Sequence, residues 1–166
     1  MWRGGACIFM KGIIEAYGER ARRVFVADSF QGLPKPDAAN CAADTGDVHH
    51  TYAQLAVSRQ DVEDNFRSYQ LLDDRVVFLE GWFKDTLHLA PIDKLAVCRV
   101  DGDMYESTIQ ALTALYHKLQ PGGFLIVDDC FLAPCAQAVN EFRARHGIVE
   151  PILPIDGMGA YWRRSL

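Results

Sequence analysis

Residues 95–103 read "LAVCRVDGD", an apolar run that closes on two aspartates. A second run of the same kind, "FLIVDD" at 124–129, closes on the pair Asp128 and Asp129. Short, nearly continuous apolar runs of this type are typical of strands that are buried on both faces of a parallel sheet. Carboxylates repel one another, so four of them at strand ends need a cation, a proton or a cationic ligand beside them.

The rest of the chain alternates between strand-like and helix-like segments. Further strands are expected at 23–29 ("RVFVADS") and at 75–81 ("RVVFLEG"), with two short strands within 150–164. Helices are expected at 6–18, from Ser58 onward, from Ser107 through Leu119, and at 134–147. The third of these helices should stop at Pro121, Gly122 and Gly123. Such alternation predicts an α/β fold, Rossmann-like, with a mainly parallel sheet and helices on both faces. At 166 residues we expect a single domain, 1–166.

Acidic residues end every expected parallel strand. They are Asp28, Glu80, Asp101, Asp128 and Asp129. In open α/β sheets, ligands bind beyond the carboxyl ends of the strands. The pattern therefore predicts that these carboxylates gather along one edge, where they face a ligand.

Asp101, Asp128 and Asp129 are candidate metal ligands. Three carboxylates from two strand ends suit a hard cation such as Mg²⁺, which takes a few carboxylates together with water and substrate oxygens. A solvent-facing "DD" turn is the alternative. The stretch "VDGDMY" also matches the pattern of aspartate-nucleophile phosphatases, but Tyr105 stands where they have Thr or Val, and the gap to Asp128 holds one helix only.

Other candidates are weaker, and each has a plain structural alternative. Asp28 at the end of its strand could accept hydrogen bonds from ribose hydroxyls, or it could simply cap a turn. Gly4 and Gly5 would let the backbone approach a ligand at a helix start. His49 and His50, in a loop from 32 to 52 rich in Pro, Asp and Gly, could act as a base or contact substrate, or lie on the surface.

Trp82 and Phe83 follow Gly81 and could either stack on an aromatic ligand or seal the edge of the core.

The composition excludes several classes of protein. The net charge is −5 without a basic run, so a nucleic acid is not an expected partner, and the apolar runs are too short for a membrane span. Five cysteines without a CxxC pair indicate a reduced, cytoplasmic protein without a zinc site.

Six stretches together resemble the macrocin O-methyltransferase family, whose members methylate sugar hydroxyls of antibiotics. They are "WRGGACIFMKG", "VFVADSFQGLPKP", "LLDDRVVFLEGWFKDTL", "VDGDMYEST", "LQPGGFLIVDD" and "GMGAYWRR", from Trp2 to Arg164. The resemblance implies a class I methyltransferase fold, S-adenosylmethionine as methyl donor, Mg²⁺, and a small glycoside as acceptor. A homodimer or a higher homo-oligomer is a separate expectation.

The resemblance implies roles for particular residues. The expected cofactor-binding residues are Gly4, Gly5, Asp28, Ser29, Phe30, Gly81, Trp82 and Asp101; the metal ligands are Asp101, Asp128 and Asp129; and the catalytic candidates are Asp101, His49 and His50, with Asp103 beside Asp101. The family pattern carries "ETGV" directly before "WRGG", at the end of a central first strand, so we expect that strand to be missing from this sequence. A cofactor-binding fragment with little activity is therefore the alternative function.

Overall fold

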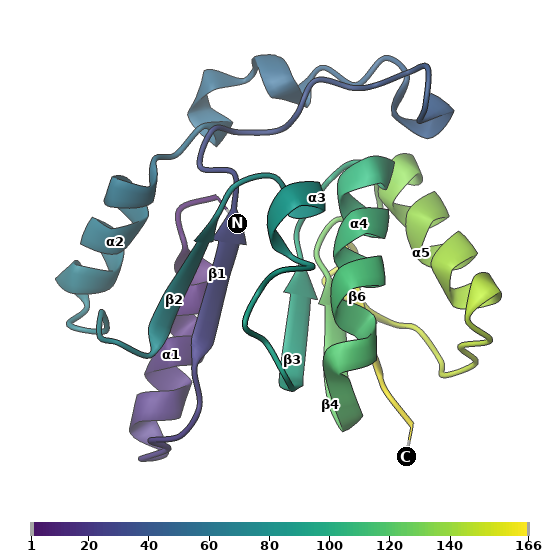
Figure 1. Ribbon diagram of the computed structural model, residues 1–166. Coiled ribbons are helices and arrows are strands. Elements are labelled where there is room, and N and C mark those ends of the chain that lie inside the picture. Colours follow the sequence, from purple (N-terminus) through teal and green to yellow (C-terminus); the bar gives the residue numbers. More distant parts are fainter. Residues whose placement is uncertain (1, 166) are drawn as a thin grey trace. The chain divides into compact units, whose positions relative to one another are not determined.

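The computed structural model describes residues 2–165 and divides into two compact units (Figure 1). One unit holds the residues up to Pro34 together with Val48–Thr86; the other holds Lys35–Asp47 and the chain from Leu87 onward. The predicted α/β fold is confirmed in both, since each unit pairs parallel strands and packs helices on them. That the whole chain is a single domain stays a prediction.

The first unit is built on two parallel strands. Its elements are α1 (Gly5–Ala16), β1 (Val24–Asp28), two 3₁₀ turns (His49–Thr51 and Ala53–Leu55), α2 (Arg59–Ser68), β2 (Val76–Glu80) and the short α3 (Phe83–Thr86). Strands β1 and β2 run in register, so that Asp28 lies opposite Glu80 at their carboxyl ends.

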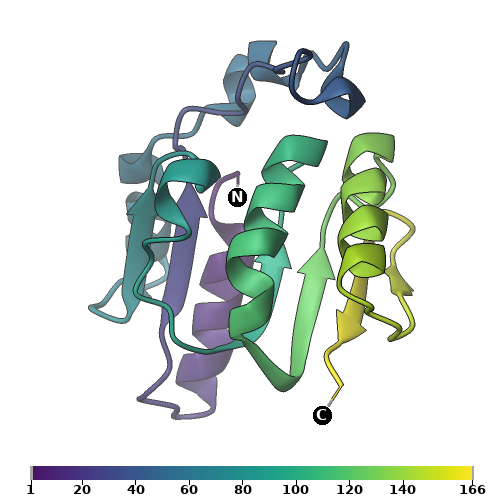
Figure 2. The same cartoon turned by 45° about the vertical axis from the view of Figure 1, so that its right-hand side comes forward.

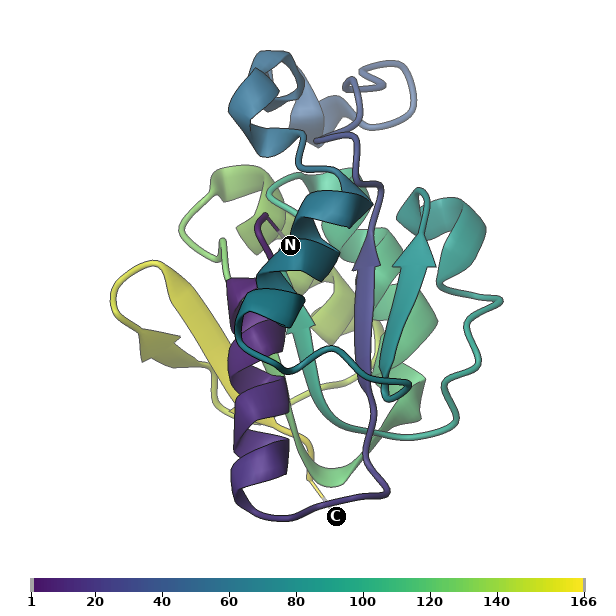
Figure 3. The ribbon, with the colours of Figure 1, turned by 90° about the vertical axis from the view of Figure 1, so that its left-hand side faces the viewer.

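The core of this unit lies between the sheet and the helices α1 and α2, which lie beside each other and beside β1 in Figure 3. Val26, Val62 and Phe66 are fully buried there. Helix α2 starts at the predicted N-cap, where the Ser58 hydroxyl accepts a hydrogen bond from the backbone N–H of Asp61, whose carboxylate bonds back to Ser58. This reciprocal pairing satisfies backbone donors that the first helical turn leaves open.

The second unit is built on four strands in the order β3-β4-β6-β5. Its elements are a 3₁₀ turn (Ala42–Asp44), β3 (Leu95–Val100), α4 (Tyr105–Leu115), a 3₁₀ turn (Tyr116–Lys118), β4 (Leu119–Val127), α5 (Ala133–Arg145), β5 (Leu153–Ile155) and β6 (Gly159–Arg163). Strands β3 and β4 are parallel, and the C-terminal hairpin of β5 and β6 joins antiparallel, as its glycines predict. Helices α4 and α5 lie side by side against this sheet (Figure 2).

One predicted boundary in this unit is wrong. Helix α4 does not run to Pro121 but ends at Leu115, and Leu119 already starts β4. Leu119 is fully buried and pairs with Leu95 across the parallel ladder, so sheet packing outweighs the helical spacing. The ladder shifts register after Leu95, and such irregularities tolerate a proline within a strand. Between residues 2 and 165 no helix is both long and apolar enough to cross a bilayer.

Candidate active site

The parallel ladder of β3 and β4 brings Asp101 and Asp128 side by side. Val100 and Val127 are register partners, and each strand ends there. The backbone N–H of Asp128 donates to the carbonyl oxygen of Val100 at 2.9 Å, which extends the ladder by one bond. The two aspartates are therefore the next residues on neighbouring strands, and the structure places them together as the strand pattern predicts.

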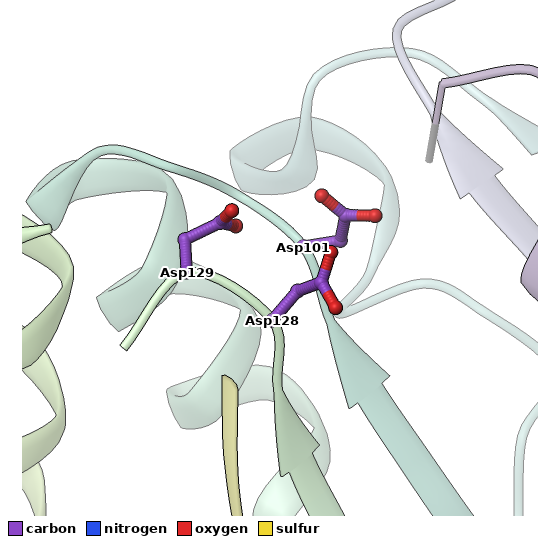
Figure 4. Close-up of side chains that lie close together, drawn as sticks. All are labelled: Asp101, Asp128 and Asp129. Carbon is purple, nitrogen blue, oxygen red and sulfur yellow. The ribbon is translucent and has the colours of Figure 1, made fainter. Parts of the chain in front are cut away.

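Asp129 completes a group of three. Asp101, Asp128 and Asp129 each offer one carboxylate oxygen such that the three atoms lie within 4.8 Å of one another. Figure 4 shows Asp101 beyond the end of β3, and Asp128 and Asp129 beyond the end of β4, with the side chains turned toward a common space. The backbone N–H of Asp103 donates to Asp129 Oδ2 at 3.3 Å. The role of Asp103 as a neighbour of Asp101 stays a prediction. We call these three aspartates the carboxylate cluster.

A glycine lets the loop after β3 lie tightly on α4. A Cβ at Gly102 would lie 3.2 Å from Ser107 Cβ and 3.4 Å from the backbone nitrogen of Thr108. The next residue, Asp103, has a left-handed backbone with φ 55°. The sequence "DGD" therefore makes a sharp turn. Gly102 lies closest to α4, with Asp101 on one side of it and Asp103 on the other.

The negative charges of the carboxylate cluster are only partly balanced by nearby positive charge. Burial raises the pKa of Asp129 to about 7, and the charges of Asp103, Asp101 and Asp128 raise it as well, against one backbone hydrogen bond that lowers it. A carboxyl group with such a pKa takes up a proton near neutral pH unless a cation replaces it. The donor set is entirely oxygen and anionic, which fits Mg²⁺.

Arg99 supplies part of the missing charge, and the sequence analysis did not identify it. Its Nη1 donates to Asp101 Oδ2 at 2.6 Å and its Nη2 contacts Asp128 Oδ2 at 2.5 Å. Burial tends to lower the pKa of Arg99, but Asp101 and Asp128 outweigh it and raise the pKa above its ordinary value. Arg99 lies two residues before Asp101, and alternate residues of a strand share a face, so the spacing was the available signal.

Asp44 is a second residue that sequence reasoning missed. Its carboxylate is 1% exposed and accepts from the backbone N–H groups of Tyr105 at 2.7 Å and Glu106 at 3.0 Å. It thus caps α4, whose own N-cap residue, Met104, makes no side-chain cap. Burial, together with Asp44, raises the pKa of the Cys41 thiol to about 11, so Cys41 donates its proton to this carboxylate. Part of the long loop is thereby fixed to the start of α4.

The other candidates belong to the first unit, where Asp28, Ser29 and Phe30 form a turn after β1. Asp28 Oδ1 accepts from the backbone N–H of Phe30 at 2.9 Å, and the Ser29 hydroxyl donates to the Gly32 carbonyl at 2.7 Å. The turn role of Asp28 is therefore real, and it fixes the direction of the carboxylate. Phe30 has φ 57° and is buried against Phe78, with 6.1 Å between ring centroids. Its contact with a cofactor stays a prediction.

The predicted glycines Gly4, Gly5 and Gly81 lie at the ends of helices and strands in the first unit. Gly4 is the buried, left-handed N-cap of α1, and Gly5 is its first residue. The N–H of Gly81 donates to the carbonyl of Asp28 at 2.9 Å, which joins the ends of β1 and β2. Trp82 directly precedes α3, and its carbonyl accepts from the N–H groups of Asp85 and Thr86. Whether its ring stacks on a ligand stays a prediction.

His49 and His50 lie in the 3₁₀ turn His49–Thr51 of the first unit, away from any strand end in sequence. His49 packs edge-on against Tyr52, with 5.5 Å between ring centroids. His50 Nδ1 is buried and has no hydrogen-bond partner among the described residues. These observations describe only the immediate surroundings of the two rings. Their catalytic role stays a prediction.

Solved structures resemble the chain closely. One described as the O-methyltransferase NovP superposes with a TM-score of 0.96 at 52% identity, covering 100% of this chain and 69% of that one. The calicheamicin methyltransferase CalS11 superposes with a TM-score of 0.71 at 20% identity over 97% of this chain and 68% of that one, a likeness of fold alone. The predicted class I methyltransferase fold is confirmed.

Curated relatives point the same way. A demethyldecarbamoylnovobiocin O-methyltransferase from Streptomyces niveus is 52% identical over 99% of this chain, and a mycinamicin III 3''-O-methyltransferase from Micromonospora griseorubida is 51% identical over 99%. The chain spans 64% and 66% of the length of these relatives. The family model described as macrocin-O-methyltransferase (TylF) matches residues 1–164. The resemblance seen in the sequence is confirmed, and the chain belongs to the macrocin-O-methyltransferase family.

Proposed function

We propose that the chain is an S-adenosylmethionine- and Mg²⁺-dependent O-methyltransferase that acts on a sugar hydroxyl of a glycosylated natural product. The observation that supports this most is the carboxylate cluster, because it joins three oxygens within 4.8 Å at the ends of two paired strands in a chain of this family. The relatives are named as O-methyltransferases of demethyldecarbamoylnovobiocin and of mycinamicin III, which supports a glycosylated natural product as acceptor.

The carboxylate cluster would hold the metal. A bound Mg²⁺ supplies Lewis acidity that lowers the pKa of a coordinated hydroxyl group. Of the chain's own residues, Asp101 is the candidate to accept the hydroxyl proton, with His49 and His50 as the alternatives. Asp103 contributes by orienting Asp129 through its backbone N–H. Fixing these groups on strand ends favours catalysis, because methyl transfer depends strongly on the position of the reacting atoms.

Asp28 would bind the ribose of the methyl donor. Asp28 is the last residue of β1, at the carboxyl edge of the parallel pair, and the hydrogen bond that its carboxylate accepts from Phe30 holds it in one orientation. The further candidates for contact with the methyl donor are Ser29, Gly4, Gly5, Gly81 and Trp82. In such folds an acidic residue near a strand end commonly accepts a hydrogen bond from a ribose hydroxyl group.

The test is methyl transfer from labelled S-adenosylmethionine to a glycosylated acceptor, with and without excess chelator. We expect transfer in Mg²⁺, its loss in chelator and its return when Mg²⁺ is added back. Asp129→Asn should reduce transfer by a factor on the order of 10 to 100, a range typical for changes around a metal. Asp93→Asn is the matched control, because Asp93 is an exposed aspartate of the same unit.

Equal transfer in chelator would overturn the metal dependence. A chain that binds S-adenosylmethionine but transfers nothing in Mg²⁺ would support the alternative of a cofactor-binding fragment. The family match favours methyl transfer over the phosphatase hypothesis. The cytoplasmic location and the homo-oligomer stay predictions, and size-exclusion chromatography with light scattering tests the second of these.

A further inference from the structure

Arg99 is engaged with two of the three aspartates through one defined oxygen of each. Nη1 binds Asp101 Oδ2 at 2.6 Å, and Nη2 lies 2.5 Å from Asp128 Oδ2. The two nitrogens belong to one planar guanidinium group, so a single side chain spans the ends of β3 and β4. The Arg99 side chain is only 22% exposed, which limits the freedom of this bridge.

This bridge limits how the carboxylates can bind a cation. With Oδ2 of Asp101 and Oδ2 of Asp128 bound by Arg99, a cation that avoids these two atoms can take only one oxygen from each carboxylate. Mg²⁺ demands near-octahedral geometry and takes one oxygen from each carboxylate, whereas Ca²⁺ takes six to eight oxygens and often both oxygens of one carboxylate. The contacts of Arg99 with Oδ2 of Asp101 and Asp128 therefore favour Mg²⁺, the smaller ion.

We propose that Arg99 is a positioning residue that sets the metal selectivity of the carboxylate cluster, by restricting Asp101 and Asp128 to one oxygen each and so favouring Mg²⁺ over Ca²⁺. This inference rests on the proposed metal site. It assigns Arg99 a role in the choice of ion and in the alignment of the ligand oxygens.

The test measures metal binding to the chain of residues 1–166 after a chelator has removed bound metal, without any methyl transfer. Mn²⁺ serves as the probe, since the electron paramagnetic resonance signal of free Mn²⁺ falls as it binds, and Mg²⁺ or Ca²⁺ is then added to displace it. In Arg99→Met we expect the affinity for Ca²⁺ relative to Mg²⁺ to rise roughly tenfold, the lower end of the range for residues that orient metal ligands. Arg99→Lys keeps the charge but lacks the planar fork, so the ratio should rise there too.

Arg145→Met is the matched control. Arg145 is exposed in the last turn of α5, and its loss removes one positive charge from the same unit. The ratio should stay at the parent value in this variant. If Arg99→Met does not fold, as judged by circular dichroism, the Lys variant decides.

Two results would overturn the inference, and they are distinguishable. A ratio within about twofold of the parent in the folded Arg99 variants would reject the positioning role, given the much larger effects of residues that orient ligands. This includes the case in which both ions bind more tightly by the same factor, where Arg99 acts only as a competing charge. A parent chain that binds no Mn²⁺ would reject the metal site of the proposed function, and the selectivity with it.

Discussion

At the scale of single residues, Asp129 predicts how the metal-free protein responds to pH. Its pKa in the folded chain is about 7, above the ordinary value of 3.8. The folded state therefore holds a proton that the unfolded state releases between these values, and the free energy of unfolding falls as pH rises through this window. The stability that Asp129 contributes is full below about pH 4 and lost near pH 7.

Urea unfolding in chelator between pH 4.5 and 8 measures this effect. The parent should lose stability from pH 4.5 up to about pH 7 and then level off, and Asp129→Asn, which keeps the shape without the titrating group, should lose less. Saturating Mg²⁺ should remove the difference in slope, since protons and the cation compete for the same oxygens. Parallel pH profiles for parent and variant in chelator would contradict the prediction.

The same residues show what sequence can predict about a site. Asp101, Asp128 and Asp129 could be found because each follows an apolar strand, and strand ends of a parallel pair meet at one edge. Arg99 could have been found as well, two positions before Asp101 on the same strand. Asp44 could not, because it meets Tyr105 across 61 residues of chain, and no local pattern encodes such a pairing.

At the scale of secondary-structure elements, the start of α4 depends on a residue from outside the helix. Asp44 accepts from two N–H groups of its first turn, where a negative charge also interacts favourably with the helix dipole. Asp44→Ala leaves both part-buried N–H groups without this acceptor. We expect the free energy of unfolding to fall by about 2 kcal/mol, the upper end for a lost helix cap.

Chemical denaturation of Asp44→Ala, Asp44→Asn and Asp61→Ala checks this. The Asn variant keeps one acceptor oxygen and should lose less than the Ala variant. Asp61, in the exposed capping box of α2, is the control for an ordinary cap and should cost less than Asp44. An Asp44→Ala variant as stable as Asp61→Ala would show that the buried cap adds nothing.

The elements themselves were predictable wherever local pattern and packing agree. Strand β2, the N-cap Ser58 and the C-terminal hairpin follow from apolar runs, a capping residue and two glycines. The end of α4 could not be predicted from the sequence, because Leu119 suits either a helix face or a buried strand. Its pairing with Leu95 decides between them. Long-range pairing is information that periodicity does not carry.

At the scale of the whole molecule, the predicted binding residues divide between the two compact units. Asp28, Gly4 and Gly81 belong to the first, and the carboxylate cluster belongs to the second. The two ligands of the proposed function, S-adenosylmethionine and Mg²⁺, should therefore leave different traces in the chain. Local opening governs amide exchange, so a ligand slows exchange most in the segment that it contacts.

Hydrogen exchange with S-adenosylhomocysteine or Mg²⁺ added separately tests this division. The nucleoside should slow exchange at the start of α1 and in the turns after β1 and β2, and Mg²⁺ should slow it in the turns after β3 and β4. Asp28→Ala should abolish the first effect and leave the second intact. Glu80→Ala is the control, because Glu80 lies opposite Asp28 at the same strand edge yet pairs with Arg59 on the surface. Protection by the nucleoside that survives in Asp28→Ala would remove Asp28 from the binding site, while protection by Mg²⁺ confined to the first unit would place the metal elsewhere.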